Sequence, residues 1–183
     1  MDATGPTEIV LGVTGSIAAY KAAELTRLFI REGWTVHVVM TRAATEFVAP
    51  LTFQTLSRNP VATDPFAPPA EWKPAHVSLA DRADALVIAP ATANIIAKLA
   101  LGLADDLLSS TALACPAPLV IAPAMNDIMF DHPATQANLR TLEERGARIV
   151  APGRGDLACG REGRGRMAEP AEIVAILAAL LDE

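Results

Sequence analysis

The sequence predicts a single α/β domain built on a doubly wound parallel sheet with helices on both faces. Its 183 residues are the usual length of one domain, and 51% of them are hydrophobic, which is enough for a substantial core. Short apolar segments alternate with longer segments of helical periodicity. The short segments are apolar almost throughout, which is typical of strands buried on both faces of a parallel sheet. We therefore expect one Rossmann-like or flavodoxin-like domain over residues 1–183.

Five strands and four long helices account for most of this pattern. The expected strands are residues 8–14, 35–41, 85–89, 118–122 and 147–151. The expected helices are residues 16–32, 91–114, 134–145 and 171–181, with a shorter helix-like segment at 77–84. Gly33 and Gly146 follow two of these helices as stop signals. In a sheet of this kind, ligands bind at the carboxyl ends of the strands.

Charge and sequence patterns argue against several classes of protein. The formal net charge is −6, which is unlike that of a nucleic-acid-binding protein. The N-terminal residues include Asp2 and Glu8 and lack the basic region of a signal peptide. The uncharged run 107–126 resembles a membrane span in length, but its three prolines would break a membrane helix, so we read it as a helix end, a turn and a strand. We expect a cytoplasmic protein without a membrane segment.

Two segments depart from the strand–helix alternation. Residues 58–74 are rich in proline and are expected to form a loop. Residues 153–169 hold five glycines and four arginines in an otherwise acidic protein. A solvated surface loop is one interpretation of this composition. The other is a flexible clamp that closes over an anionic ligand, with the glycines as hinges and the arginines as anion donors.

The first expected strand leads directly into a glycine turn and a helix. The turn reads GVTGSI over residues 12–17, and free N–H groups at the start of the helix favour a phosphate near Gly15. It matches neither the dinucleotide-binding fingerprint nor the P-loop, and a tight turn can also require glycine for purely structural reasons. The hydroxyl groups of Ser16 and Thr41, which lie at the ends of the first two strands, favour a phosphate or mononucleotide site.

Two further turns, after the third and fourth expected strands, contain a proline followed by an asparagine. Residues 90–94 read PATAN and residues 123–126 read PAMN. The proline forces the chain out of the sheet, and the amides of Asn94 and Asn126 offer donors and an acceptor suited to a carboxylate or a heterocycle. Either turn taken singly is consistent with an ordinary asparagine turn. Their occurrence at neighbouring strand ends favours a binding site.

Few side chains are candidates for acid, base or nucleophilic chemistry. His76 is one, because an imidazole titrates near neutrality and suits a general base. Cys159 is another, since its glycine and arginine neighbours would expose it and favour the thiolate. His37 is interpreted as a packed strand residue, His132 as a turn residue and Cys115 as a small apolar side chain. No spacing of cysteine and histidine indicates a metal site.

Five segments, in this order, resemble the flavin-containing cysteine decarboxylases. They are VTGSIAAYK at 13–21, HVSLA at 76–80, PATAN at 90–94, PAMN at 123–126 and LACGREGRGRM at 157–167. The resemblance extends over nearly the whole chain, from about Glu8 to Leu181. It is closest to the branch of the family that acts on 4′-phosphopantothenoylcysteine in coenzyme A synthesis.

The resemblance implies an FMN cofactor held between the subunits of a homotrimer, which can assemble further into a dodecamer. The positions that match the family's flavin-binding residues are Gly15, Ser16, Ile17, Thr41, Phe47, Ala91, Thr92, Ala93 and Asn94. The catalytic positions would be His76, Asn126 and Cys159, with Asn126 on the substrate carboxylate. The substrate pocket would be formed by Met125, Asn126, Ala158, Cys159, Gly160 and Met167.

The activity implied is decarboxylation of 4′-phosphopantothenoyl-L-cysteine to 4′-phosphopantetheine, through a thioaldehyde, loss of CO₂ and re-reduction, with Cys159 as the final proton donor. The synthetase that joins cysteine to phosphopantothenate, fused in many bacterial members, would be encoded separately or lie outside this chain. The leading alternative is a peptidyl-cysteine decarboxylase of a modified-peptide pathway. A flavin prenyltransferase and a flavin-binding regulatory protein are weaker alternatives, because neither requires His76, Asn126 and Cys159 together.

Overall fold

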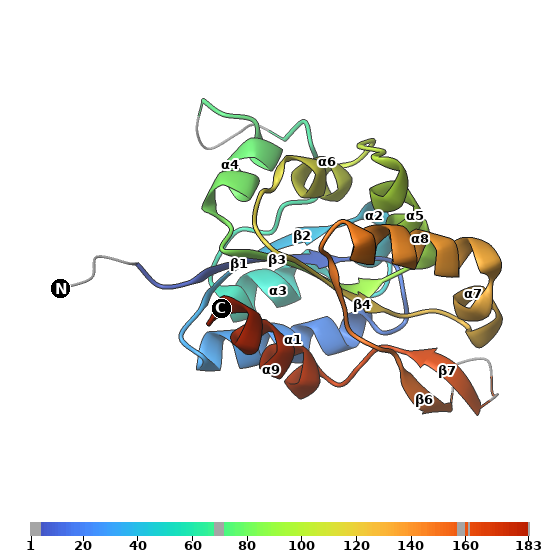
Figure 1. The fold of residues 1–183 in the computed structure, drawn as a ribbon. Helices are drawn as coiled ribbons and strands as arrows, with labels where there is room; N and C mark the ends of the chain where they lie inside the picture. The colour runs from blue at the N-terminus through green and yellow to red at the C-terminus, as the bar shows by residue number, and fades with distance from the viewer. Residues whose placement is uncertain (1–4, 68–71, 157–159, 161, 183) are drawn as a thin grey trace.

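The central sheet of the protein has five parallel strands in the order β2-β1-β3-β4-β5 (Figure 1). The computed structural model describes residues 5–67, 72–156, 160 and 162–182. The strands are β1 (Glu8–Val13), β2 (Thr35–Met40), β3 (Ala85–Ala91), β4 (Leu119–Pro123) and β5 (Arg148–Ile149). The predicted doubly wound α/β fold is confirmed. Strand order reverses between β1 and β3, and this is where folds of this class bind ligands.

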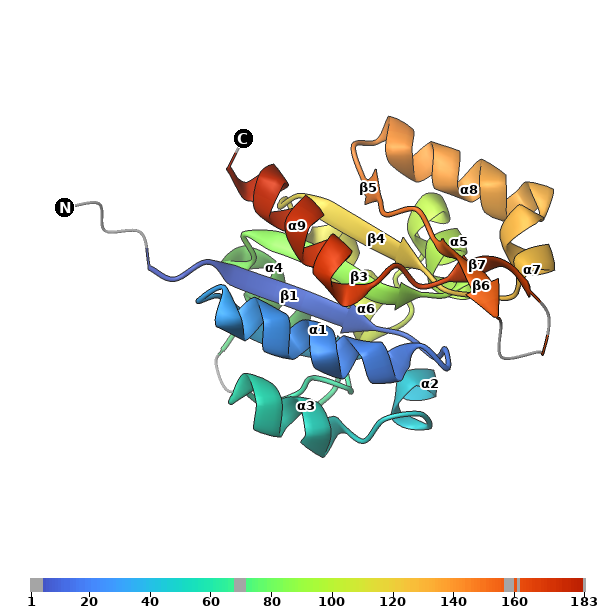
Figure 2. The ribbon, with the colours of Figure 1, turned by 90° about the horizontal axis from the view of Figure 1, so that it is seen from below.

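Helices cover both faces of the sheet (Figures 1 and 2). One face carries α1 (Ala19–Arg31), α3 (Pro50–Ser57) and α9 (Pro170–Leu181). The opposite face carries α4 (Ala75–Arg82), α5 (Ala93–Leu101), α6 (Leu107–Ala114) and α8 (Pro133–Glu144). Two short helices, α2 (Arg42–Thr45) and α7 (Asp127–Asp131), follow the carboxyl ends of β2 and β4.

Burial on both faces explains why the strands are apolar almost throughout. Along β1, Ile9 and Leu11 belong to the core under α1 and α9, whereas Val10 belongs to the core under α5 and α6. All seven residues of β3, the middle strand of the sheet, are buried. Because neither face contacts water, the strands do not show the polar–apolar alternation of a half-exposed sheet.

The long helix expected over residues 91–114 is wrong, because two helices, α5 and α6, occupy this segment. Gly102 ends α5 in the left-handed conformation, with φ +70°. Asp106 then caps α6, accepting a hydrogen bond from the backbone N–H of Ser109 at 2.8 Å, and the Ser109 hydroxyl accepts one from the Asp106 backbone N–H at 3.1 Å. Gly102 is an ordinary stop signal for a helix, and Asp106 is an ordinary start signal.

The glycine- and arginine-rich segment contains an antiparallel hairpin of two strands, β6 (Gly153–Asp156) and β7 (Glu162–Arg166). The hairpin lies beside α7, beyond the carboxyl ends of the central strands (Figure 2). Of the two interpretations of this segment, an irregular surface loop is wrong for the described residues, because they form strands, whereas the clamp stays a prediction. Gly163 and Gly165 allow β7 to lie close to the chain after β4, because a Cβ on either residue would overlap Asp127 or Met125.

The uncharged run from Leu107 to Asn126 folds as the sequence predicts, into α6, a turn and β4. Within the parts of the chain that the structure describes, no helix combines the length and the apolar content needed to span a bilayer.

The cap of α6 is also an electrostatic cluster. Lys98 on α5 contacts Asp105 at 2.6 Å and Asp106 at 2.7 Å. Partial burial raises the pKa of Asp106, but the hydrogen bonds from Lys98 and Ser109 outweigh burial and hold this pKa below its ordinary value of 3.8. A carboxyl group whose pKa is lowered by folding stabilises the folded state above its unfolded pKa.

We predict that Asp106→Ala lowers the free energy of unfolding by about 1 kcal/mol at pH 7, because the cap and the Lys98 contact are both lost. Asp106→Asn keeps a capping oxygen and should be less harmful. The difference between wild type and Asp106→Asn should shrink as the pH falls through the folded-state pKa of Asp106. Denaturant unfolding followed by circular dichroism measures both effects, and a difference that grows on acidification would contradict the assignment.

Candidate functional site

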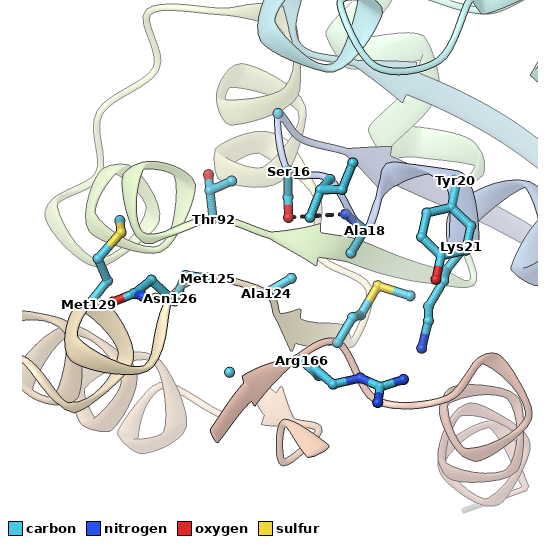
Figure 3. Close-up of a pocket in the computed structure, with 14 residues that line it drawn as sticks. Ser16, Ala18, Tyr20, Lys21, Thr92, Ala124, Met125, Asn126, Met129 and Arg166 are labelled. Atoms are coloured by element: carbon cyan, nitrogen blue, oxygen red, sulfur yellow. Dashed lines mark hydrogen bonds between the residues drawn. The ribbon is translucent and has the colours of Figure 1, made fainter. Parts of the chain in front are cut away.

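A cavity of about 570 Å³ opens where the carboxyl ends of β1, β3 and β4 meet the start of α1, α7 and strand β7 (Figure 3). Cofactor and substrate pockets have volumes of this order. Most of its lining is apolar, and polar side chains occur at a few places. The apolar lining includes Ile17, Ala18, Ala124, Met125, Met129 and Met167, and the polar lining includes Ser16, Tyr20, Lys21, Thr92, Asn126 and Arg166.

A buried threonine joins the ends of β1 and β3 at this cavity. The Thr14 hydroxyl donates to the carbonyl oxygen of Pro90 at 2.7 Å and accepts from the backbone N–H of Thr92 at 3.1 Å. Thr14 is only 2% exposed. These two bonds hold the turn that contains Ser16 beside the turn that contains Thr92.

Backbone hydrogen bonds extend this arrangement to β4 and the hairpin. Ala124 donates to the carbonyl oxygen of Ala91 at 2.9 Å, and Met125 donates to that of Gly165 at 3.0 Å. Gly165 has φ +131°, and a Cβ there would overlap the carbonyl oxygen of Met125. Glycine at this position therefore allows β7 to lie directly against the turn that precedes Asn126.

Gly15 has a structural explanation. A Cβ on Gly15 would lie 2.5 Å from the Cβ of Ala43, so the close packing of the α2 turn requires glycine here whether or not a ligand binds. The sequence left open a ligand and a structural reason for this residue, and the structure supplies the structural one. Next to it, the Ser16 hydroxyl accepts a hydrogen bond from Ala18 at 3.3 Å, at the entrance to α1.

In the view of Figure 3, Asn126 lies on the side of the cavity opposite to Lys21. Its side-chain oxygen accepts a hydrogen bond from the backbone N–H of Ile128 at 3.0 Å, which caps α7. This bond fixes the plane of the amide next to Met125 and Met129, which also line the cavity. An oriented amide in an apolar pocket can hold a carboxylate group.

Lys21 and Arg166 bring positive charge to the cavity. Lys21 is 8% exposed, and its Nζ lies 2.8 Å from an Oε1 oxygen of Glu169; an Nη of Arg166 lies 3.6 Å from the same oxygen. The hydrogen bond from Lys21 holds the pKa of Glu169 below its usual range. Lys21 was not among the predicted site residues, although its position one helical turn after Ile17 indicates the same side of the helix.

Only part of the predicted flavin-binding set lines this cavity. Gly15, Ser16, Ile17 and Thr92 do so. Thr41 caps α2 and borders a second hollow of about 530 Å³, together with Arg42 and Asp105. Phe47 is 49% exposed, and it lies outside both lining sets. The remaining members belong to β3 or the start of α5 and do not line the cavity either; they are Ala91, Ala93 and Asn94.

The structure does not bring His76 together with Asn126 within one chain. His76 lies half-buried in the first turn of α4, on the sheet face away from α1, and it is not among the cavity residues. Its catalytic role stays a prediction.

His37 lies 3.0 Å from Glu8, and burial is the largest cause that lowers its pKa. Burial raises the pKa of the Cys115 thiol, in keeping with a packed apolar side chain.

The predicted clamp residues are placed in part. Met167 is buried and lines the cavity, whereas Gly160 is exposed. Ala158 and Cys159 lie outside the described residues. Among the described arginines of residues 153–169, Arg166 lines the cavity, and Arg154 and Arg164 do not. Arg164 instead pairs with Asp131 at 3.6 Å.

A parallel sheet with a cavity at its switch point, bordered by a serine turn and an oriented asparagine, defines a small-molecule or cofactor site of the flavodoxin-like kind. The chain belongs to the flavoprotein family, whose family model, described as Flavoprotein, matches residues 2–182. The family resemblance predicted from the sequence is thereby confirmed.

Two curated relatives are bacterial coenzyme A proteins. The Coenzyme A biosynthesis bifunctional protein CoaBC of Vibrio cholerae is 50% identical over 175 residues, covering 96% of this chain and 44% of the relative. CoaBC of Bacillus subtilis is 49% identical over 166 residues, covering 91% of this chain and 41% of the relative. The chain thus spans less than half the length of these relatives.

Solved structures of similar proteins match almost the whole chain. A cysteine-to-serine mutant of PPC decarboxylase complexed with pantothenoylaminoethenethiol superposes with a TM-score of 0.86 at 31% identity, covering 98% of this chain and all of that one. The FMN-dependent cysteine decarboxylase SpaF gives 0.80 at 34% identity, with 94% and 97% covered. The FMN binding protein AtHal3 gives 0.84 at 32% identity, with 97% and 98% covered.

We predict that Thr14→Val destabilises the protein by about 1–3 kcal/mol, because the buried carbonyl of Pro90 and the partly buried N–H of Thr92 then lose this partner. Thr14→Ser retains the hydroxyl and is the matched control. Thermal unfolding at one protein concentration measures the effect. A valine variant as stable as wild type would show that this hydroxyl does not hold the two strand ends together.

Proposed function

We propose that this chain is an FMN-dependent decarboxylase that converts 4′-phosphopantothenoyl-L-cysteine to 4′-phosphopantetheine in coenzyme A biosynthesis. The observation that carries the proposal is the cavity at the β1/β3 switch point, which has Ser16 at the entrance to a helix and the oriented Asn126 amide on its wall. The CoaBC relatives and the PPC decarboxylase structure support the substrate. We further propose that residues 1–183 act as one flavoprotein domain.

The cavity residues fit a flavin mononucleotide. Apolar side chains such as Ile17, Met125 and Met167 suit a flat aromatic ring. The turn at Ser16 leads into a helix of 13 residues, and the N–H groups at its start suit a phosphate. When bound, FMN would supply the reversible two-electron acceptor that a cysteine carboxylate needs before it can lose CO₂.

The chain's own residues would orient the substrate and move its protons. Asn126 would hold the substrate carboxylate in the apolar part of the cavity, where its loss as CO₂ is favoured. His76 would act as the base that accepts a proton from the cysteine unit. Cys159 would donate the last proton to carbon as the enethiol product is reduced to the saturated thiol. The PPC decarboxylase mutant that binds pantothenoylaminoethenethiol supports a cysteine at this last step.

We also propose a homotrimer, with dodecamers as a higher assembly, in which a neighbouring copy supplies His76. Two observations support this. His76 is absent from the lining of the cavity that contains Asn126. Large apolar side chains are also exposed and would be covered by another copy; they include Ile17 at 59%, which lines the cavity, and, outside its lining, Phe47 at 49% and Ile128 at 61%. The bifunctional relatives support a synthetase, fused or separately encoded, as the functional partner.

The proposed activity is tested by anaerobic incubation of the purified flavoprotein with 4′-phosphopantothenoylcysteine, followed by mass spectrometry. We expect loss of CO₂ and formation of 4′-phosphopantetheine. Asn126→Ala should lower kcat/KM by at least about 100-fold, because the reacting carboxylate loses its partner. Unchanged substrate together with a decarboxylated cysteine peptide would favour the peptidyl-cysteine alternative.

A Cys159→Ser variant separates the decarboxylation from the final reduction. It should keep bound flavin and release CO₂, and it should accumulate the enethiol in place of the saturated thiol. Normal product at the normal rate would remove Cys159 from the mechanism.

Subunit complementation tests the shared site. His76→Asn and Asn126→Ala should each be inactive alone, with flavin retained in the histidine variant. Co-assembled in one oligomer, they should recover a fraction of wild-type activity, because some interfaces then combine an intact His76 with an intact Asn126. Mixed oligomers without activity would show that both residues act within one chain.

A further inference from the structure

One side of the cavity carries two cations that share a single carboxylate. Lys21 and Arg166 both line the cavity, and in Figure 3 the Lys21 Nζ points toward the Arg166 guanidinium. The Oε1 oxygen of Glu169 contacts both cations, at 2.8 Å from the Lys21 Nζ and 3.6 Å from an Nη of Arg166. Asn126 lies on the other side of the same cavity.

We propose that Lys21 and Arg166 form the subsite for the phosphate of the substrate, and that Glu169 occupies this subsite as an internal anion until the phosphate displaces it. The proposal rests on the proposed function and deepens it. The substrate has two anionic ends, a cysteine carboxylate and a phosphate. The cavity offers an amide on one side and two cations on the other, so it matches both ends.

Burial of Lys21 and the planar guanidinium of Arg166 make this pair of cations a strong anion site. The Lys21 side chain is 9% exposed, so its charge is little screened by solvent. Arg166 is 42% exposed and lies on β7, where its planar guanidinium can bind phosphate through two N–H groups. Glu169, by contrast, is 65% exposed. It returns to water at small cost when another anion takes its place.

When the substrate phosphate displaces Glu169, the negative charge of the anion at the subsite also increases. Glu169 carries one negative charge, and a phosphate monoester carries nearly two at neutral pH. Two cations around one carboxylate leave a local excess of one positive charge, which a phosphate would neutralise. The position of Glu169 directly before α9 allows its side chain to turn outward without moving Lys21 on α1.

The competing explanation is a structural latch, by which we mean that the Lys21–Glu169 contact only holds α1 against the start of α9. The two residues are 148 positions apart in the sequence. The phosphate of FMN is a second possible occupant of a cationic subsite. A latch would affect phosphorylated and unphosphorylated ligands equally. An FMN phosphate site would change flavin content.

The test compares binding of 4′-phosphopantetheine and pantetheine to the flavin-loaded protein by calorimetry. We expect wild type to bind 4′-phosphopantetheine at least about tenfold more tightly than pantetheine, because two charge-assisted contacts to the phosphate contribute that much affinity. Arg166→Gln should bring the two affinities within about twofold, with pantetheine binding and flavin content unchanged. Glu169→Gln should increase the preference for the phosphorylated ligand.

Arg164→Gln is the matched control, because Arg164 lies on the same strand but pairs with Asp131. It should leave the ratio of affinities unchanged. Equal losses for both ligands in Arg166→Gln would overturn the proposal in favour of a latch, and loss of flavin in this variant would overturn it in favour of the FMN phosphate. The ratio is measured without turnover, so a failure to release CO₂ would refute the proposed function separately from the subsite.

Discussion

Burial of the parallel sheet on both faces is the constraint on which the rest of the structure depends. Each connection must leave the carboxyl end of a strand, cross a face as a helix and return to the opposite edge. The turns after β1, β3 and β4 therefore meet at one edge. Ser16, Thr92 and Asn126 come from segments far apart in the sequence and line one cavity for this reason. Hydrophobic burial thus positions polar groups that take no part in the core.

Backbone contacts then determine the shape of that edge. Thr14 joins β1 to β3, Ala91 joins β3 to β4, and Gly165 joins the turn after β4 to the hairpin. Two of the glycines in the characteristic motifs, Gly15 and Gly165, are explained by neighbouring protein atoms that lie too close for a Cβ. A glycine motif at a binding site therefore reports close packing of the chain as much as the approach of a ligand.

The charge distribution is local and does not follow from the net charge. An acidic protein with a formal charge of −6 places Lys21 and Arg166 in its cavity and balances them with Glu169. In the proposed function the same cavity receives anions at both sides, and the base arrives on another copy of the chain. Orientation of the substrate would then come from one subunit and proton transfer from its neighbour, so assembly would be a condition of activity.

By itself the sequence determined the fold class, because continuous apolar strands that alternate with helical segments are typical of a parallel sheet covered on both faces. It also identified Ser16 and Asn126, because turns that follow such strands share an edge, and the family resemblance added Thr92. Only the tertiary structure decided that β6 and β7 pair, that Arg166 rather than Arg164 faces the cavity, that Lys21 meets Glu169 and that His76 lies apart from Asn126. These features depend on contacts between residues distant in the sequence, and local periodicity carries no information about them.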